Sequence, residues 1–141
     1  MMKHPSGATW AARRGMQPKA LGRGIVRDGK VEAGGGELTL ASICPDGMAV
    51  FLDLNKGYLQ PGHAHPDHES LGYVISGRIR MVVDGSEAIL EPGDSWRHPK
   101  GSLHITEALE DSMALEVHIP LRADVLERFG LDQSRVRPST S

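Results

Sequence analysis

Two histidines in the segment PGHAHPDHES, which begins at Pro61, stand two residues apart. Residues i and i+2 point to the same face of an extended strand, whereas in a helix they point in nearly opposite directions. Pro61, Gly62 and Pro66 exclude a regular helix, so we expect an extended segment with His63 and His65 on one face. Two imidazoles on one inward face suit zinc, nickel, iron, copper or manganese. Two exposed loop histidines are the alternative.

A second segment, GDSWRHPKGSLH, ends at His104 and supplies a third histidine. Together the two segments resemble the two motifs of the cupin superfamily, in its single-domain, conserved-barrel form. The first motif matches at Gly57, His63, His65 and Gly77, and the second at Gly93, Pro99, Gly101 and His104. The motifs span residues 57–108, and the strand pattern extends the likeness to about 25–121. Ala108 stands where the second motif ends in Asn.

The resemblance implies an all-β fold, the cupin double-stranded β-helix or jelly-roll barrel, with a divalent transition metal (Ni, Zn, Fe or Mn) held by His63, His65 and His104. It also implies a glutamate ligand, whose position here is ambiguous. Counting on from His65 gives Glu69, whereas counting back from Gly77 gives Ser70. A one-residue slip turns a side chain to the other face of a strand, unless a bulge intervenes. We expect Glu69 as the fourth ligand, with His68 or a water molecule as alternatives.

The segment LEVHIPLRAD, residues 115–124, places Glu116 and His118 on one strand face and apolar residues on the other. It is similar to the last strand of the small cupins of pectin and alginate degradation that linearise unsaturated uronates. Those proteins have Asp and an aromatic residue at these two positions, and usually Gln at the position of Ser70. The resemblance implies that Glu116 or His118 moves protons and that Arg122 binds a carboxylate. Solvent-facing Glu116 and His118, and a salt bridge from Arg122 to Asp124 or Glu116, are the alternatives.

Gly and Pro are frequent and scattered, with 17 and 9 copies, which is typical of short strands joined by tight turns. We predict hairpins at residues 28–29 and 84–85 and a bulge at Gly77. A short helix is expected after Arg122, with Asp124 as N-cap and Gly130 as its stop. The expected organisation is an N-terminal arm (1–20), a barrel domain (21–122), and a C-terminal helix and tail (123–141).

The net charge of −2 and the pI of about 6.4 do not suggest a nucleic-acid or membrane partner. No segment approaches the roughly 20 apolar residues that span a bilayer, and no secretory signal is recognisable, so a cytoplasmic location is expected. Three individual side chains also carry predictions. We expect Cys44 to be a small buried hydrophobe, Tyr73 to pack in the core and His98 to be exposed.

Three functions are compatible with these residues. The first is a metal-dependent enzyme with isomerase-like or lyase-like chemistry, acting on a small oxygenated metabolite such as a sugar acid or keto acid. The second is a metal-dependent dioxygenase of the same fold, and the third is a non-catalytic small-molecule binding or sensor module. The resemblance further implies a homodimer that pairs through the outer faces of the sheets and through the arm, residues 1–20.

Overall fold

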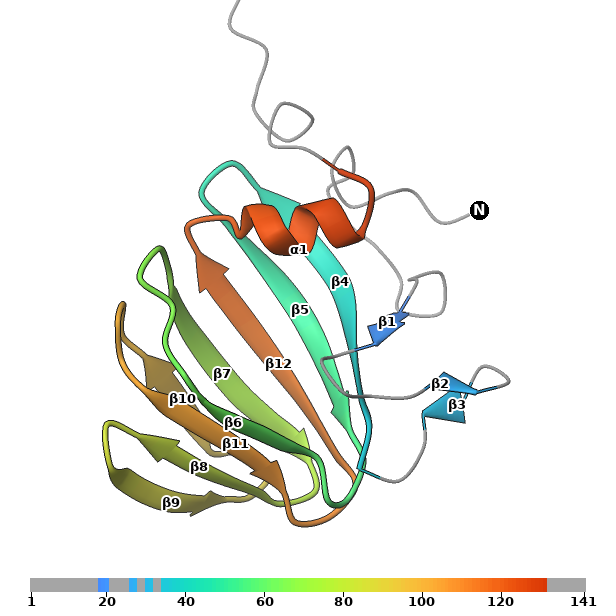
Figure 1. The fold of residues 1–141 in the computed structure, drawn as a ribbon, viewed down its shortest axis with the longest axis vertical. Coiled ribbons are helices and arrows are strands. Elements are labelled where there is room, and N and C mark those ends of the chain that lie inside the picture. Colours follow the sequence, from blue (N-terminus) through green and yellow to red (C-terminus); the bar gives the residue numbers. More distant parts are fainter. Residues whose placement is uncertain (1–17, 21–25, 28–29, 32–33, 132–141) are drawn as a thin grey trace, which may run out of the picture.

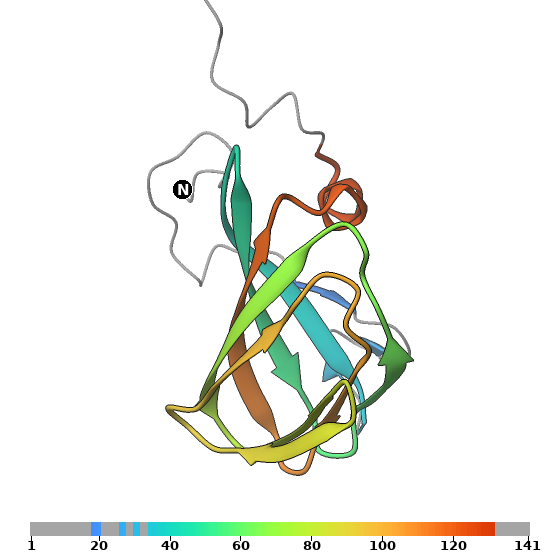
Figure 2. The same cartoon turned by 90° about the vertical axis from the view of Figure 1, so that its left-hand side faces the viewer.

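The computed structural model describes residues 18–20, 26–27, 30–31 and 34–131, which form two antiparallel sheets, a small hairpin and one short helix (Figure 1). The larger sheet has the strand order β1-β4-β5-β12-β7-β10, with bounds Pro18–Ala20, Gly36–Cys44, Gly47–Leu54, Ser112–Ile119, Glu69–Ser76 and Ser95–His98. The smaller sheet has the order β6-β11-β8-β9, with bounds Leu59–His63, His104–Ala108, Ile79–Val83 and Ser86–Leu90. The strands wrap around a central core (Figure 2), so the predicted all-β jelly roll is confirmed.

The apolar core lies between the two sheets because alternate residues of most strands point inward. One end of the barrel is covered by α1 (Ala123–Arg128), which lies near the ends of β4, β5 and β12 in Figure 1. Its buried residues are Val125 and Leu126. The helix of the described residues is too short to cross a bilayer. The core cluster includes Leu38, Leu40, Met48, Val50, Leu52, Leu54, Tyr58, Val74, Ile79, Met81, Trp96, Ala108, Ala114 and Leu121.

The predicted turns are largely confirmed. Asp84 and Gly85 both have positive φ, 47° and 81°, and join β8 to β9 in a two-residue hairpin. The strands β2 (Val26–Arg27) and β3 (Lys30–Val31) pair around residues 28–29, which lie outside the described residues. Gly77 differs from the prediction, since it follows the last residue of β7 with a φ of 88°, and the register shift lies before it, between Val74 and Ser76.

The two ends of the helix differ in how well the sequence predicted them. Asp124 is not the N-cap, because that position is Arg122, which has an extended backbone and makes no capping hydrogen bond through its side chain. Asp124 lies instead in the first turn. Gly130 follows the C-cap with a φ of 71°, and its N–H donates to the carbonyl of Glu127, so the predicted stop is confirmed. The division into an arm, a barrel and a tail remains a prediction; Pro18–Ala20 of the arm forms β1 and pairs with β4.

The neighbouring strands β7 and β12 have an unusual polarity. Their inward positions include Ser70, Glu116 and His118, whereas their outward positions are mainly apolar. Tyr73 lies on the outer face and is half exposed, so its predicted core position is wrong. Cys44, at the end of β4, is also exposed rather than buried. The polar interior marks the candidate site, and the outer face leaves Leu71, Tyr73, Ile75 and Ile119 exposed.

We propose that this apolar outer face pairs with a second copy of the chain, because contiguous exposed apolar surface commonly marks an interface. Light scattering at micromolar concentration should then give a dimer mass. Tyr73→Glu should shift the mass toward that of a monomer, because it buries a charge in the interface. Ile89→Glu is the matched control, since Ile89 is similarly exposed but lies on β9 of the other sheet. A monomeric wild-type protein would contradict the proposal.

Candidate metal centre

Three histidines converge at the end of the barrel that lies near α1. His63 ends β6 and His104 begins β11, and these two residues are direct partners in the antiparallel pairing of the strands. His65 lies in the loop after β6, not in the strand as predicted, but its ring centroid is 4.6 Å from that of His63. One potential ligand atom from each of the three imidazoles lies within 4.8 Å of the others. The predicted three-histidine cluster therefore forms.

The free nitrogens of this cluster suit a metal ion. Nδ1 of His63 lies 3.0 Å from the carbonyl oxygen of Pro61, and Nδ1 of His104 lies 3.4 Å from that of Ser102. Because a carbonyl only accepts, the proton is on Nδ1 and the lone pair of Nε2 is available. Burial lowers the pKa of His65 and of His104 to about 4, so both are neutral near pH 7. Neutral imidazoles with oriented lone pairs fit a divalent transition metal.

Glu69 does not join the cluster, and this corrects the expected fourth ligand. Its carboxylate lies 3.0 Å from Nη2 of Arg97 on β10. The strand β7 pairs with β12 in regular register from Glu69 to Val74, and with β10 from Ser70 to Tyr73, without the bulge near Glu69 that would turn its side chain inward. Period-two alternation then places Ser70 inside, where it is 2% exposed. The strand register therefore decides which of the two residues faces the interior, and that residue is Ser70.

Two further buried histidines lie beside the cluster. His98 was expected to be exposed but is 5% exposed, because it points inward at the end of β10 and stacks on His104 with ring centroids 3.8 Å apart. The alternation of Trp96 and His98 in the segment SWRH could have revealed this position. His68, the alternative fourth ligand, is buried next to His65, with ring centroids 4.5 Å apart. It is not part of the group whose ligand atoms converge.

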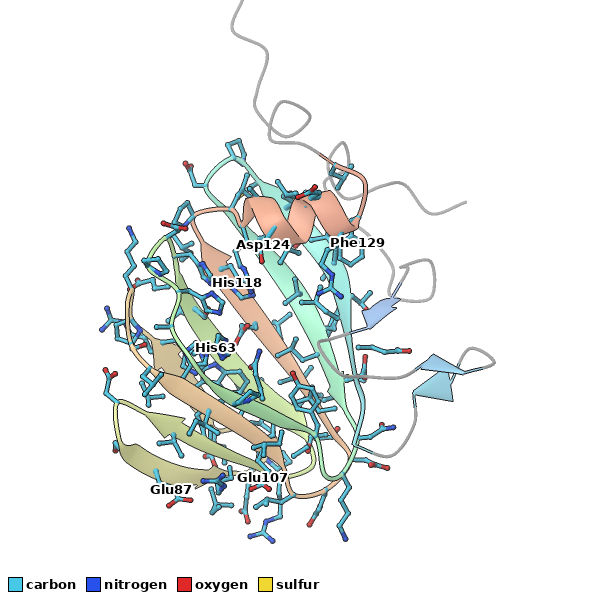
Figure 3. The ribbon with its side chains drawn as sticks, in the orientation of Figure 1. His63, Glu87, Glu107, His118, Asp124 and Phe129 are labelled. Carbon is cyan, nitrogen blue, oxygen red and sulfur yellow. The ribbon has the colours of Figure 1, made fainter. Side chains whose placement is uncertain are left out.

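The last strand places its polar residues in the interior, as the resemblance implied. Glu116 and His118 are 9% and 1% exposed, so the solvent-facing alternative is wrong. Nε1–H of Trp96 donates to Oε2 of Glu116 over 3.1 Å. Nε2 of His118 lies 3.0 Å from Oε1 of the same carboxylate. The side chains of His63 and His118 both point into the space between the sheets (Figure 3).

Gly72 makes the contact between Trp96 and Glu116 possible. It lies between them in the sheet, as the direct partner of Trp96 on β10 and of Glu116 on β12. A Cβ atom on Gly72 would lie 1.9 Å from Cε2 of Trp96. The indole ring therefore crosses the sheet over a residue that has no side chain, and this lets it reach the carboxylate. No pattern in the sequence indicates this role of Gly72.

Arg122 lines the same cavity but already has a partner. Its Nε and Nη2 lie 3.2 and 2.6 Å from the carboxylate oxygens of Asp124. The salt bridge to Asp124, considered from the sequence as the alternative role, is therefore present. The cavity has a volume of about 50 Å³ and brings together nearly all the predicted site residues. Its lining includes His63, His65, His104, Glu116, His118 and Arg122.

Comparison with known proteins identifies the family. The family model described as "Cupin domain" matches residues 50–119. The chain is also 33% identical over 82 residues to the pectin degradation protein KdgF of Dickeya dadantii (strain 3937), an alignment that covers 57% of this chain and 74% of that protein.

The chain belongs to the cupin superfamily.

Two solved structures agree with this assignment. The structure of KdgF from Halomonas sp. has a TM-score of 0.72 and 25% sequence identity, and the match covers 84% of this cupin and all of that chain. An RmlC-like cupin from Shewanella frigidimarina has the same TM-score at 23% identity, covering 84% and 96% of the two chains, and it supports the fold alone.

Four buried or half-buried histidines, His65, His68, His98 and His104, make the metal-free cupin sensitive to acid. Burial lowers the pKa of His65, His98 and His104 to about 4 and that of His68 to about 3, whereas an unfolded histidine titrates near 6.5. Between these values the unfolded chain binds more protons, so stability is full above about pH 6.5 and falls toward about pH 4. In the presence of a chelator, the midpoint temperature of thermal unfolding should be lower at about pH 5 than at about pH 7. A midpoint that does not change between these two conditions would contradict the burial of neutral imidazoles.

Proposed function

We propose that this cupin is a metal-dependent enzyme that isomerises a small sugar acid, with unsaturated uronates as its substrates. The observation that carries the proposal is the presence of Glu116 and His118 in the same cavity as the three-histidine cluster. The likeness to a pectin degradation protein supports the substrate class. A non-catalytic binding module would not need a buried acid and a buried imidazole in contact beside its metal centre.

The six predicted site residues that line the cavity would have distinct roles in this reaction. A divalent metal held by His63, His65 and His104 would polarise a carbonyl or hydroxyl oxygen of the substrate. Glu116 and His118, which line the cavity, would assist the proton transfers of ring opening, in which a hemiacetal hydroxyl loses a proton and an enol carbon gains one. Arg122 is fixed by Asp124, so its positive charge is held at the cavity, where it would attract a substrate carboxylate.

Turnover with and without metal tests this proposal. Protein purified without chelator should contain a transition metal, and it should remove the ultraviolet absorbance of an unsaturated uronate, because isomerisation destroys the double bond conjugated to the carboxylate. Treatment with EDTA should abolish this conversion, and added metal should restore it. Conversion by the metal-free protein, or no conversion by the metal-loaded protein, would contradict the proposal. An oxygen electrode used on the same samples would detect the alternative, an iron-dependent dioxygenase.

A further inference from the structure

Ser70, His118 and Glu116 form a continuous chain of polar contacts on the inner face of the six-stranded sheet. Ser70 and His118 are direct partners on the adjacent strands β7 and β12, and Oγ of Ser70 lies 3.1 Å from Nδ1 of His118. Nε2 of the same imidazole lies 3.0 Å from Oε1 of Glu116. All three residues are buried and line the cavity of the three-histidine cluster.

The direction of these contacts follows from the carboxylate. An anionic oxygen 3.0 Å from Nε2 requires the proton of the neutral imidazole to be on that nitrogen, because two lone pairs would repel. Nε2 nevertheless has no hydrogen-bond partner, because its N–H does not point at Oε1 of Glu116. Nδ1 then carries the lone pair and accepts a hydrogen bond from the hydroxyl of Ser70. The hydroxyl oxygen keeps its own lone pairs for a group in the cavity.

We propose that Ser70, His118 and Glu116 form a proton relay whose cavity end is the hydroxyl of Ser70, and that Ser70 is not a metal ligand. The inference rests on the proposed function for its reaction. The substrate hydroxyl transfers its proton to Oγ of Ser70 as the Ser70 proton passes to Nδ1 of His118. As the hydroxyl becomes a carbonyl, the bond from its carbon to the ring oxygen breaks, and the ring oxygen leaves as an enolate. The imidazolium that forms is stabilised by Glu116, and its proton returns along the same path to the enolate carbon, which gives the open-chain keto form. No proton is gained or lost over the cycle.

The surroundings of Glu116 favour a stabilising role over that of a base. Burial alone would raise its pKa, but the contacts with His118 and with Nε1–H of Trp96 lower it to about 2. A carboxylate with so low a pKa is a weak base near neutral pH, whereas an imidazole is well suited to that task. The order of hydroxyl, imidazole and carboxylate is that of an activated serine, with the two ring nitrogens exchanged.

The chemistry of Ser70 also argues against a role as ligand. Its hydroxyl proton is donated to His118, and a neutral hydroxyl is a weak ligand compared with imidazole or carboxylate. The three histidines converge without any contribution from β7. Ser70 therefore occupies a position beside the metal centre while its hydrogen bond runs away from the centre, toward the last strand.

Three variants of the full chain test the relay. Ser70→Ala removes the hydroxyl, Ser70→Thr retains it, and Ser112→Ala is the matched control. Ser112 is also buried on the larger sheet, but its hydroxyl bonds the carbonyls of Arg78 and Glu110, away from the cavity lining. Thermal unfolding midpoints show that each variant is folded. Zinc affinity is measured by competition with a chromogenic chelator, and the imidazole nitrogens are followed by nitrogen-15 NMR.

Ser70→Ala should lower the zinc affinity by less than the roughly 10-fold that loss of a ligand-supporting group costs, because the hydroxyl of Ser70 bonds His118 and none of the three converging histidines. It should shift the Nδ1 resonance of His118 and lower uronate turnover by about 100-fold, the lower range for general acid–base catalysis. Ser70→Thr should restore turnover, and Ser112→Ala should change none of the three readouts.

A loss of zinc affinity in Ser70→Ala as large as that from removal of a histidine ligand would overturn the inference, because it would make Ser70 a ligand. An unchanged Nδ1 resonance of His118 would overturn it as well, since the contact would then be absent. Both readouts need no substrate. A wild-type protein that does not convert uronates would overturn the proposed function. The zinc affinity and the Nδ1 resonance of His118 would still test the contacts of Ser70.

Discussion

His104→Ala should lower the metal affinity of this cupin by about 100-fold or more, because it removes one of three ligands rather than a supporting group. His104 begins β11, and its register partner is His63, so its imidazole lies beside that of His63, with ring centroids 4.1 Å apart. Loss of the third imidazole leaves only two protein nitrogens, whereas a stable catalytic metal site has three protein ligands. Elemental analysis and calorimetric titration with zinc measure the effect, and turnover of the proposed substrate should fall with metal content.

His98→Ala is the matched control for this variant. His98 is a buried histidine stacked on His104, with an interplanar angle of 12°, but it is not part of the converging group. Its removal should weaken metal binding by about 10-fold, the low end of the range for a group that supports a ligand. Stoichiometric metal in His104→Ala, or a loss of affinity in His98→Ala as large as that in His104→Ala, would contradict the assigned ligand set.

Gly72→Ala should destabilise the protein by about 2–4 kcal/mol, because the new methyl group collides with the indole ring of Trp96. The ring is the rigid part of a buried side chain and cannot move aside without leaving its place over the sheet. Its displacement would also break the hydrogen bond from Nε1 to Glu116. Chemical denaturation measures the first effect. A loss of turnover larger than the loss of folded protein would reveal the second.

Gly62→Ala provides the comparison. Gly62 lies in β6, beside the metal centre, but a Cβ atom there would come no closer than 3.4 Å, to a side-chain carbon of Leu103. This substitution should change the free energy of unfolding by less than about 0.5 kcal/mol. A similar small effect for Gly72→Ala would mean that Trp96 does not lie over Gly72, and the described support of Glu116 would then be wrong.

The sequence predicted the parts of the site that depend on spacing. The three histidines come from two motifs with fixed offsets, and the turn at Asp84 and Gly85 requires residues that tolerate positive φ. Alternation along β12 correctly placed Glu116 and His118 on one face. These features are local, so they can be read from neighbouring residues without knowledge of which strands pair.

The features that the sequence did not predict depend on partners far along the chain. Glu69 and Ser70 are adjacent, and only pairing with β10 and β12 decides which one faces inward. His98 is buried because β10 pairs with β7, which turns its side chain inward, where it stacks on His104. Tyr73 and Cys44 are exposed because the larger sheet has an apolar outer face, which local hydrophobicity does not distinguish from a core. Asp124 pairs with Arg122 instead of capping the helix.

A crystal structure of the metal-loaded protein, with anomalous scattering recorded at the absorption edge of the metal, tests the central claim most directly. We expect one metal ion bound by nitrogens of His63, His65 and His104, with Glu69 still paired to Arg97 and Ser70 still bonded to His118. A metal ion bound by Glu69, or bound without His104, would contradict this account of the site.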